Sequence, residues 1–266
     1  MKTLTTIILM SIFVNFTIAQ NVESSIKVIR KHFQWTNTQK GFMTVALNNQ
    51  DFLDHPTDNG ATLTGYFKRG KLYKIEETVG ISYAVYKTDY YFWDGKLYFV
   101  YRTESQYKSK TDANGNFIEM DYSKTELKYQ DRQYFKNGKR IRRIEKGEML
   151  GSKANYPKSF LKEAKKYKKM IKNRYKYRAK YKMLQGTWYN KDYKAERIEI
   201  DGLIITNYQD GKYFSSGRIR FDDEHYYYQP LVEDDVETAY YMLKFTKKFF
   251  QYSYSESGTT FTYIKK

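Results

Sequence analysis

The stretch Tyr90-Tyr91-Phe92-Trp93-Asp94-Gly95-Lys96-Leu97-Tyr98-Phe99-Val100-Tyr101 decides the fold of the first half of this chain. Two β-forming runs rich in aromatic residues flank Asp94-Gly95, a dipeptide that favours the positive φ angles of a two-residue hairpin turn. From Leu97 to Tyr101 the side chains alternate, as they do where successive residues point to opposite faces of a sheet. The stretch therefore predicts a β-hairpin.

The same pattern occurs twice more in the first half of the chain. Its other copies are Tyr66-Phe67-Lys68-Arg69-Gly70-Lys71-Leu72 and Tyr134-Phe135-Lys136-Asn137-Gly138-Lys139-Arg140. The three copies begin 25 and 43 residues apart, a spacing too irregular for a solenoid of equal repeats. We therefore expect three hairpins that join into one twisted antiparallel sheet.

The hairpin motifs also carry a resemblance. The run from Tyr90 to Tyr101, preceded by Leu63-Thr64-Gly65-Tyr66-Phe67, resembles a family of uncharacterised secreted bacterial proteins, over roughly residues 24–145. Because the shared motifs are turn and strand motifs, the resemblance implies the hairpin fold. It implies no assigned activity and no functional residue.

Residues 1–19 are typical of a signal peptide. Lys2 gives a positive start, residues 7–16 are an apolar run too short to span a bilayer, and Thr17 and Ala19 are small residues where a signal peptidase would cut. We expect cleavage after Ala19, and the alternative is a short buried strand or helix. The chain has no cysteine, which excludes disulfides and a lipid-bearing cysteine. The sequence therefore predicts an exported protein, periplasmic or extracellular, without a lipid anchor and without a transmembrane helix in the mature chain.

An amphipathic helix is expected at the start of the mature chain. Val22, Ile26, Ile29 and Phe33 recur at spacings of four, three and four residues, which places them on one helical face. The region 20–157 should therefore combine this helix with the hairpin sheet.

The composition changes abruptly between Lys158 and Lys182. This segment contains 12 Lys or Arg residues and one acid, Glu163, so its net charge is +11 in a chain whose total is +17. Pro157 suits the first turn of a helix, and the segment contains no glycine. We therefore expect a basic helical connector over residues 158–182.

A helix with this charge creates a field that attracts polyanions. For an exported protein the expected anions are anionic lipid, lipopolysaccharide or acidic polysaccharide, and no nucleic acid is expected, although tyrosines interleave with the cations as in single-strand binders. The alternatives are a solvated linker helix, or a helix neutralised by acids of the flanking parts. The candidate polyanion-binding residues are Lys162, Lys165, Lys166, Lys168, Lys169, Lys172, Arg174, Lys176 and Arg178.

Residues 183–266 form a second β region. About seven or eight short segments, separated by turn dipeptides such as Asp201-Gly202 and Asp210-Gly211, predict a small antiparallel barrel or sandwich. Gly186-Thr187-Trp188 is similar to the start of the lipocalin-like barrels, in which the tryptophan closes one end. The resemblance implies a site for a small apolar or sugar ligand, with Trp188, Tyr252 and Tyr254 as the candidate ligand-binding residues. The alternative is an interior filled by side chains.

The sequence contains no recognisable catalytic or metal-binding motif. His32, His55 and His225 are isolated from one another, and the nucleophile-elbow, phosphate-loop and dinucleotide motifs are absent. We therefore assign no catalytic residue, no metal ligand and no cofactor.

Three acidic loops carry oxygen ligands suited to a cation, but none has a complete binding motif. The loop from Asp112 lacks two residues that a calcium loop needs, and Asp222–Glu224 and Glu233–Asp235 would have to converge. We expect hydrated loops at all three places.

Together these features predict a mainly β protein with accessory helices. The expected parts are a signal peptide (1–19), a helix with a hairpin sheet (20–157), a basic helical connector (158–182) and a small C-terminal barrel (183–266). The expected function is non-enzymatic binding of an anionic envelope component through the connector. Two alternatives are ligand binding in the barrel and a hydrolase that uses carboxylates of the hairpin sheet.

Overall fold

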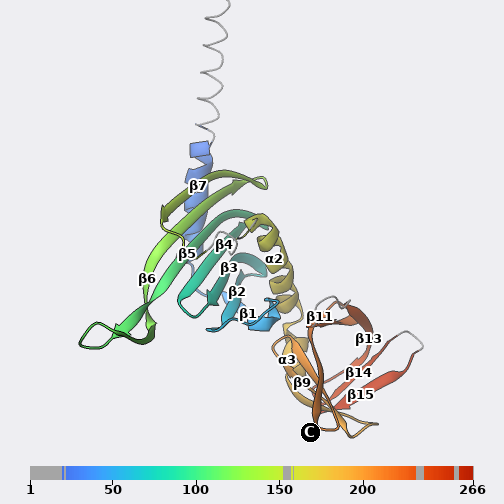
Figure 1. Ribbon diagram of the computed structural model, residues 1–266. Coiled ribbons are helices and arrows are strands. Elements are labelled where there is room, and N and C mark those ends of the chain that lie inside the picture. Colours follow the sequence, from blue (N-terminus) through green and yellow to red (C-terminus); the bar gives the residue numbers. More distant parts are fainter. Residues whose placement is uncertain are drawn as a thin grey trace, which may run out of the picture. The chain divides into compact units, whose positions relative to one another are not determined.

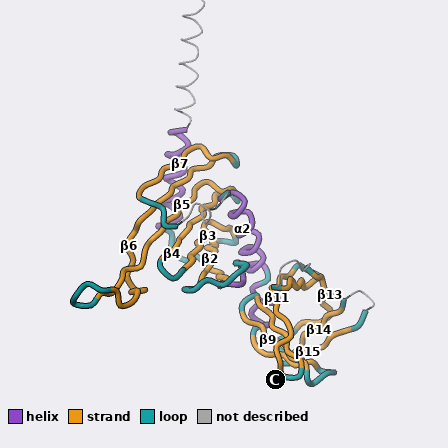
Figure 2. The backbone as a smooth tube through the Cα atoms, viewed as in Figure 1, coloured by secondary structure: helices purple, strands orange, loops and turns teal. Residues whose placement is uncertain are grey.

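The computed structural model describes residues 20, 22–151, 157, 159–231, 237–254 and 258–265. Figure 1 labels its elements, and Figure 2 shows that strands make up most of the described chain. The protein is mainly β, as predicted: the described residues form three α-helices, a seven-stranded antiparallel sheet and a closed eight-stranded barrel. The predicted signal peptide over residues 1–19 lies outside the described residues.

The first helix covers residues 22–38 and packs one face on the sheet. Ile26 and Ile29 are buried, with 1% and 6% of their surface exposed, in an aromatic cluster of the sheet. The predicted helix is confirmed, but it continues beyond Phe33. The extra turn brings the Trp35 ring to 5.2 Å from the Trp93 ring, centroid to centroid.

The sheet is a meander in which each strand pairs with the next one in the sequence. Antiparallel neighbours need only short connections, so no crossover occurs. A short 3-10 helix, η1 (Asn49–Asp51), follows the first strand. The strands are β1 (Met43–Asn48), β2 (Ala61–Lys68), β3 (Lys71–Gly80), β4 (Ala84–Trp93), β5 (Lys96–Thr111), β6 (Phe117–Lys136) and β7 (Lys139–Gly147).

The predicted two-residue turns are confirmed. Asp94 and Gly95 connect β4 to β5 with φ angles of 47° and 75°. Asn137 and Gly138 connect β6 to β7 with φ angles of 50° and 73°. Positive φ at both central residues matches the twist of the flanking strands, which explains why Asp-Gly and Asn-Gly occur at these turns.

Strands β5 and β6 extend beyond their neighbours as a two-stranded ribbon, which projects from the sheet in Figure 1. The pairing of β4 with β5 ends at Gln106, and the pairing of β7 with β6 ends at Tyr129. At the tip, the Asp112 carboxylate accepts the backbone N–H groups of Asn114 and Asn116 at 2.9 and 2.8 Å. The Asp112 side chain therefore stabilises its own turn.

Strand β7 is an edge strand with concentrated positive charge. Its nine residues include five Lys or Arg residues and one acid, Glu145. Arg142 pairs with Glu23, and Arg143 lies 2.9 Å from Glu145. Much of the positive charge along this edge therefore remains exposed.

Two helices lead into the barrel. α2 (Phe160–Lys176) and α3 (Arg178–Leu184) confirm the helical connector and are separated at Tyr177. Within the described ranges, no helix combines the length and the apolarity needed to cross a membrane.

The predicted barrel or sandwich is a closed barrel, because β8 pairs with both β9 and β15. Its neighbouring strands pair antiparallel, and the β9–β10 and β10–β11 turns are each two residues long. The strands are β8 (Gly186–Asn190), β9 (Glu196–Asp201), β10 (Ile204–Gln209), β11 (Lys212–Phe221), β12 (His225–Pro230), β13 (Thr238–Phe245), β14 (Phe249–Ser253) and β15 (Thr260–Ile264).

Aromatic and aliphatic side chains fill the barrel interior. Trp188 and Phe221 have 0% of their surface exposed, and Phe250 has 1%. The Trp188 indole N–H donates to the Leu184 carbonyl at 2.6 Å, so its polar atom has a partner inside the core. The interior is a packed core, one of the two arrangements that eight-stranded barrels adopt.

The chain separates into two compact units. One comprises the residues up to Thr44 together with Gly65–Lys165, and the other comprises Val45–Thr64 together with Lys166–Lys266. The structure therefore places Val45–Thr64 with the barrel, whereas the sequence-based boundaries kept it with the hairpin sheet.

Long-range hydrogen bonds explain this placement. The Asp51 carboxylate accepts the backbone N–H of Leu203 at 2.7 Å. The Arg218 guanidinium donates to the carbonyls of Gln50 and Leu53, both at 2.8 Å. These bonds satisfy backbone groups that a buried loop would otherwise leave without partners.

Candidate functional site

Helix α2 has one apolar face and one cationic face. At about 100° per residue, Phe160, Ala164, Tyr167 and Ile171 lie on one side, each with no more than 6% of its surface exposed. The opposite side is exposed and spans about 120° of the helix circumference. We call its six lysines the cationic face: Lys162, Lys165, Lys166, Lys169, Lys172 and Lys176.

Among the described residues, most of the cationic face has no acidic partner. Lys176 pairs with Asp223, with Nζ and Oδ2 2.9 Å apart. In the part of the chain that the structure describes, the side chains of the other five lysines form no ion pair and no hydrogen bond. The acidic group Glu233–Asp235 lies outside the described residues. The acids that are described therefore leave most of the helix charge uncompensated.

The structure separates three predicted polyanion-binding residues from the cationic face. Arg174 lies on the buried side, where its guanidinium carbon is 4.5 Å from the centre of the Tyr181 ring and burial lowers its pKa. Lys168 lies at the margin, where burial and then the charge of Lys172 lower its pKa. Arg178 is exposed but belongs to α3. Arg174 therefore does not belong to the cationic face, because the helical period directs its side chain to the buried side of α2.

The tyrosines between the cations belong to the core. Tyr167, Tyr177 and Tyr181 have 6%, 8% and 1% of their surface exposed. The Tyr181 hydroxyl donates to the Asn173 side chain at 2.6 Å. Stacking of nucleic-acid bases needs exposed ring faces, so these three rings form no such surface.

A cavity of about 290 Å³ adjoins the cationic face within the barrel unit. Buried apolar side chains contribute to its floor, and exposed polar side chains stand at its rim. The buried residues are Leu203 and Ile219, the half-buried Met170 lies beside them, and the exposed residues are Lys166, Lys169 and Gln229. Sequence analysis missed this cavity, because its residues come from both connector helices, the β9–β10 turn, β11, β12 and Glu237, which only the folded barrel unit brings together.

Two arginines that line the same cavity are already engaged. Arg220 donates to Glu237 at 2.6 Å, and its guanidinium carbon lies 3.5 Å from the centre of the Tyr227 ring. Arg218 donates to two backbone carbonyls. Lys166 and Lys169 are therefore the two cations of the cavity that have no partner among the described residues.

The three residues predicted to bind a ligand in the barrel lie in different environments. Trp188 has 0% of its surface exposed, and Tyr254 has 56%. Tyr252 is stacked on Tyr263, with ring centroids 6.0 Å apart. A side chain without water-accessible surface has no ligand-sized cavity beside it, so the structure places Trp188 in the packed core.

Three carboxylates of the hairpin sheet, those of Glu76, Asp89 and Glu104, contact cations. Lys74 Nζ lies 3.1 Å from Asp89 and 2.9 Å from Glu76. Arg102 pairs with Glu104 at 3.1 Å. A hydrolase of the carboxylate type needs two acids that face each other across a substrate cleft. Glu76, Asp89 and Glu104 instead neutralise the charges of Lys74 and Arg102, as in structural ion pairs.

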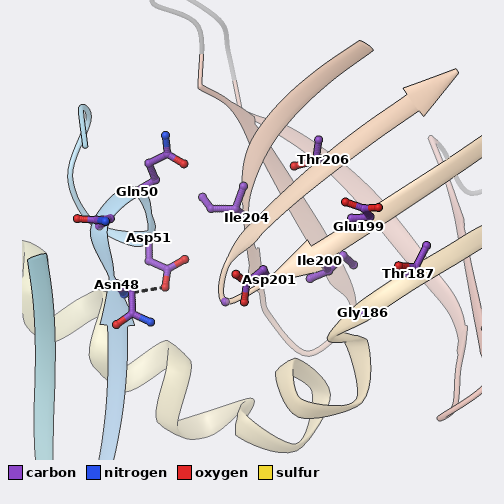
Figure 3. A pocket seen from close by; sticks show the side chains of 12 residues that line it. Asn48, Gln50, Asp51, Gly186, Thr187, Glu199, Ile200, Asp201, Ile204 and Thr206 are labelled. Atoms are coloured by element: carbon purple, nitrogen blue, oxygen red, sulfur yellow. Dashed lines mark hydrogen bonds between the residues drawn. The ribbon is translucent and has the colours of Figure 1, made fainter. Parts of the chain in front are cut away.

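A larger cavity, of about 520 Å³, is lined by η1 and by strands β8, β9 and β10. Its carboxylates are Asp51, Glu199 and Asp201, and Figure 3 shows Asp51 pointing toward the β9–β10 turn. Burial raises the Asp51 pKa, against the effect of two backbone N–H groups, those of Asn48 and Leu203. Glu199 is bonded to neighbouring side chains. Two of the three acids are therefore used in structural bonds.

Two of the histidines, His32 and His225, contact partners of their own. His32 stacks on Trp93 with ring centroids 3.9 Å apart, and burial lowers its pKa against the opposing charge of Asp94. His225 Nδ1 lies 3.3 Å from Asp222. Among the residues that the structure describes, no three His, Asp or Glu side chains are grouped so that they could hold a metal ion.

Comparisons of the chain with protein-family models, with curated proteins and with solved structures found no match. The choice of site therefore depends on the geometry. The cationic face is the feature in which uncompensated charge, exposure and an adjoining cavity coincide.

Proposed function

We propose that the protein binds an anionic component of the cell envelope through the cationic face of α2. The observation that supports this proposal is the row of five exposed lysines without acidic partners among the described residues. Because the opposite face of the helix is anchored in the core, the charges are held close together and their fields add. The export expected from residues 1–19 restricts the anion to lipid, lipopolysaccharide or acidic polysaccharide.

A solvated linker helix accounts less well for α2. A linker is exposed on every side, whereas Ile171 and Ala164 have 0% and 2% of their surface exposed. The buried face anchors the helix, and that anchoring does not require lysines on the opposite side. Neutral polar residues would keep the exposed side soluble, so the concentration of charge favours a role in binding.

The test is retention on heparin-like and phosphate-bearing matrices across a salt gradient. The variant reverses four unpaired charges of the cationic face: Lys165→Glu, Lys166→Glu, Lys169→Glu and Lys172→Glu. The control variant makes the same change in net charge at exposed lysines elsewhere: Lys31→Glu, Lys139→Glu, Lys146→Glu and Lys212→Glu. Glutamate and lysine have similar helix propensities, and the strand positions Lys139, Lys146 and Lys212 are exposed, so both variants should fold.

The face variant should bind far more weakly than the control. At about 1 kcal/mol for each lysine near an anionic surface, loss of four lysines weakens binding roughly a thousandfold at low salt. The difference should shrink as salt screens the charges. Equal elution of the two variants at every salt concentration would show that net charge, and not the cationic face, governs retention.

A further inference from the structure

We infer that the anion recognised at the cationic face is an amphiphile, whose charged group binds Lys166 and Lys169 while its apolar part enters the cavity beside them. The inference rests on the proposed function and names the ligand class of the same site. It commits to an anionic lipid or a similar monoester, and not to a polysaccharide.

The cavity combines the two kinds of surface that such a ligand requires. Leu203 and Ile219, with 5% and 1% of their surface exposed, contribute an apolar floor, and Met170 lies beside them. Lys166 and Lys169 stand at the rim with no ion pair in the described part of the chain. Charge and apolar surface therefore meet within one recess of about 290 Å³, a volume at the low end for ligand sites.

The polar groups of the wall favour an amphiphile over a sugar chain. The Asn173 side chain is used by Phe221 and Tyr181, and Arg220 is used by Glu237. Sugar hydroxyls placed on the apolar floor would therefore lose water without gaining partners, which is unfavourable. Transfer of methylene groups from water to the same place is favourable. At the rim, the exposed Gln229 amide has no hydrogen bond to described residues and can serve the charged group.

The first experiment compares two small ligands on the full-length chain by NMR titration. The ligands are inorganic phosphate and hexyl phosphate, which share the charged group and differ in the apolar chain. Hexyl phosphate should saturate one site at least tenfold more tightly than inorganic phosphate, because only its chain can use the floor. Equal affinities would overturn the inference, since a surface that recognises charge alone does not distinguish the two.

The second experiment fills the cavity without changing the charge. Gln229→Trp places a large ring at an exposed rim position of β12, and Gln209→Trp is the control at an exposed position of β10 that does not line the cavity. Gln229→Trp should weaken hexyl phosphate binding at least tenfold, and the control should leave it unchanged. Circular dichroism verifies that both variants fold, and the comparison of ligands on the unmodified chain remains decisive if one does not.

A third pair of variants separates the cavity from the rest of the face. Lys166→Gln with Lys169→Gln should abolish hexyl phosphate binding, whereas Lys162→Gln with Lys165→Gln, outside the cavity, should leave it intact. If both pairs weaken the binding of hexyl phosphate and of heparin equally, the proposed function stands and the amphiphile inference fails. If neither pair affects either ligand, both fail.

Discussion

Asp51 accepts the backbone N–H of Leu203 through Oδ1 at 2.7 Å, although 152 positions separate the two residues in the chain. Its Oδ2 atom accepts the N–H of Asn48 at 2.8 Å. One carboxylate therefore ties the η1 segment to the β9–β10 turn. Gly202 lies so close that an added Cβ would stand 2.8 Å from Asp51 Oδ2. The contact accordingly requires both a carboxylate at 51 and a glycine at 202.

Replacement of Asp51 by alanine should destabilise the barrel unit. Loss of both acceptors leaves two amides without their partners, which costs about 1–3 kcal/mol of unfolding free energy. Urea unfolding measures this loss. The control is Asp201→Ala at an exposed acid of the same cavity, which should change stability by less than about 0.5 kcal/mol. Similar losses in both variants would mean that the Asp51 bonds contribute nothing specific.

Two glycines of the β6–β7 region should respond very differently to alanine. Gly138 has a φ of 73° with no atom within 4 Å of a built Cβ, so Gly138→Ala should cost only backbone strain, about 1–2 kcal/mol. Gly147 has a φ of 86°, and its Cβ would lie 1.9 Å from the Lys128 carbonyl oxygen. Steric overlap adds to strain there, so Gly147→Ala should cost about 3 kcal/mol or more. Thermal unfolding compares the two, and equal costs would contradict the close approach at Gly147.

The stability of the barrel should depend on pH through Asp222. Partial burial opposes its ionisation, but hydrogen bonds from the Tyr227 hydroxyl and from the N–H groups of His225 and Glu224 outweigh burial and lower its pKa to about 2. A carboxyl pKa that is lower in the folded than in the unfolded state stabilises the fold above about pH 4. This contribution is lost as the pH falls toward 2.

The corresponding variant is Asp222→Asn. The full shift would correspond to about 2.4 kcal/mol, but the side chain is 42% exposed, so solvent screening reduces the expected effect to about 1 kcal/mol. The difference in unfolding free energy between the unmodified chain and the variant should narrow between pH 6 and pH 2. A constant difference over that range would exclude this role of Asp222.

Replacement of Trp188 by phenylalanine tests whether the barrel interior is a packed core. The change removes the N–H group that donates to the Leu184 carbonyl and leaves a cavity in the core. We expect the free energy of unfolding to fall by about 2–4 kcal/mol. Retention on anionic matrices should not change, because the cationic face is untouched. Tyr254→Phe, at a side chain with 56% of its surface exposed, is the control and should be nearly neutral. A stable Trp188→Phe variant would indicate a loosely packed interior instead.

The local chemistry of the sequence was sufficient for the hairpins and the first helix. Asp94-Gly95 and Asn137-Gly138 determine their turns through backbone conformations that few other dipeptides adopt. The residues of each turn are therefore sufficient to predict its hairpin. The helix of residues 22–38 was likewise predictable, because its buried face is a periodic pattern within a single segment. Its end was not, since the last turn is stabilised by contacts with the sheet.

The site was predictable only in part. Net charge identified α2, and the position of Ile171 on the apolar face could have shown that Arg174 turns away from the other cations. The cavity and the placement of Val45–Thr64 could not be predicted in the same way. The cavity depends on contacts between α2 and barrel strands that are distant in the sequence. The placement of Val45–Thr64 depends on contacts between residues more than a hundred positions apart, such as that between Asp51 and Leu203, and no local pattern exists for either.

The charge along β7 has a consequence for self-association. The closed barrel offers no free edge, whereas the sheet ends at β1 and at β7, and a strand of another molecule could add to β7. Such an addition between two copies would bring rows of lysine and arginine side by side, and their repulsion opposes it. Salt shortens the reach of that repulsion, to about 8 Å at physiological ionic strength. Concentrated solutions in dilute buffer should therefore stay free of aggregates that pair through β7, and such pairing should begin when salt is added.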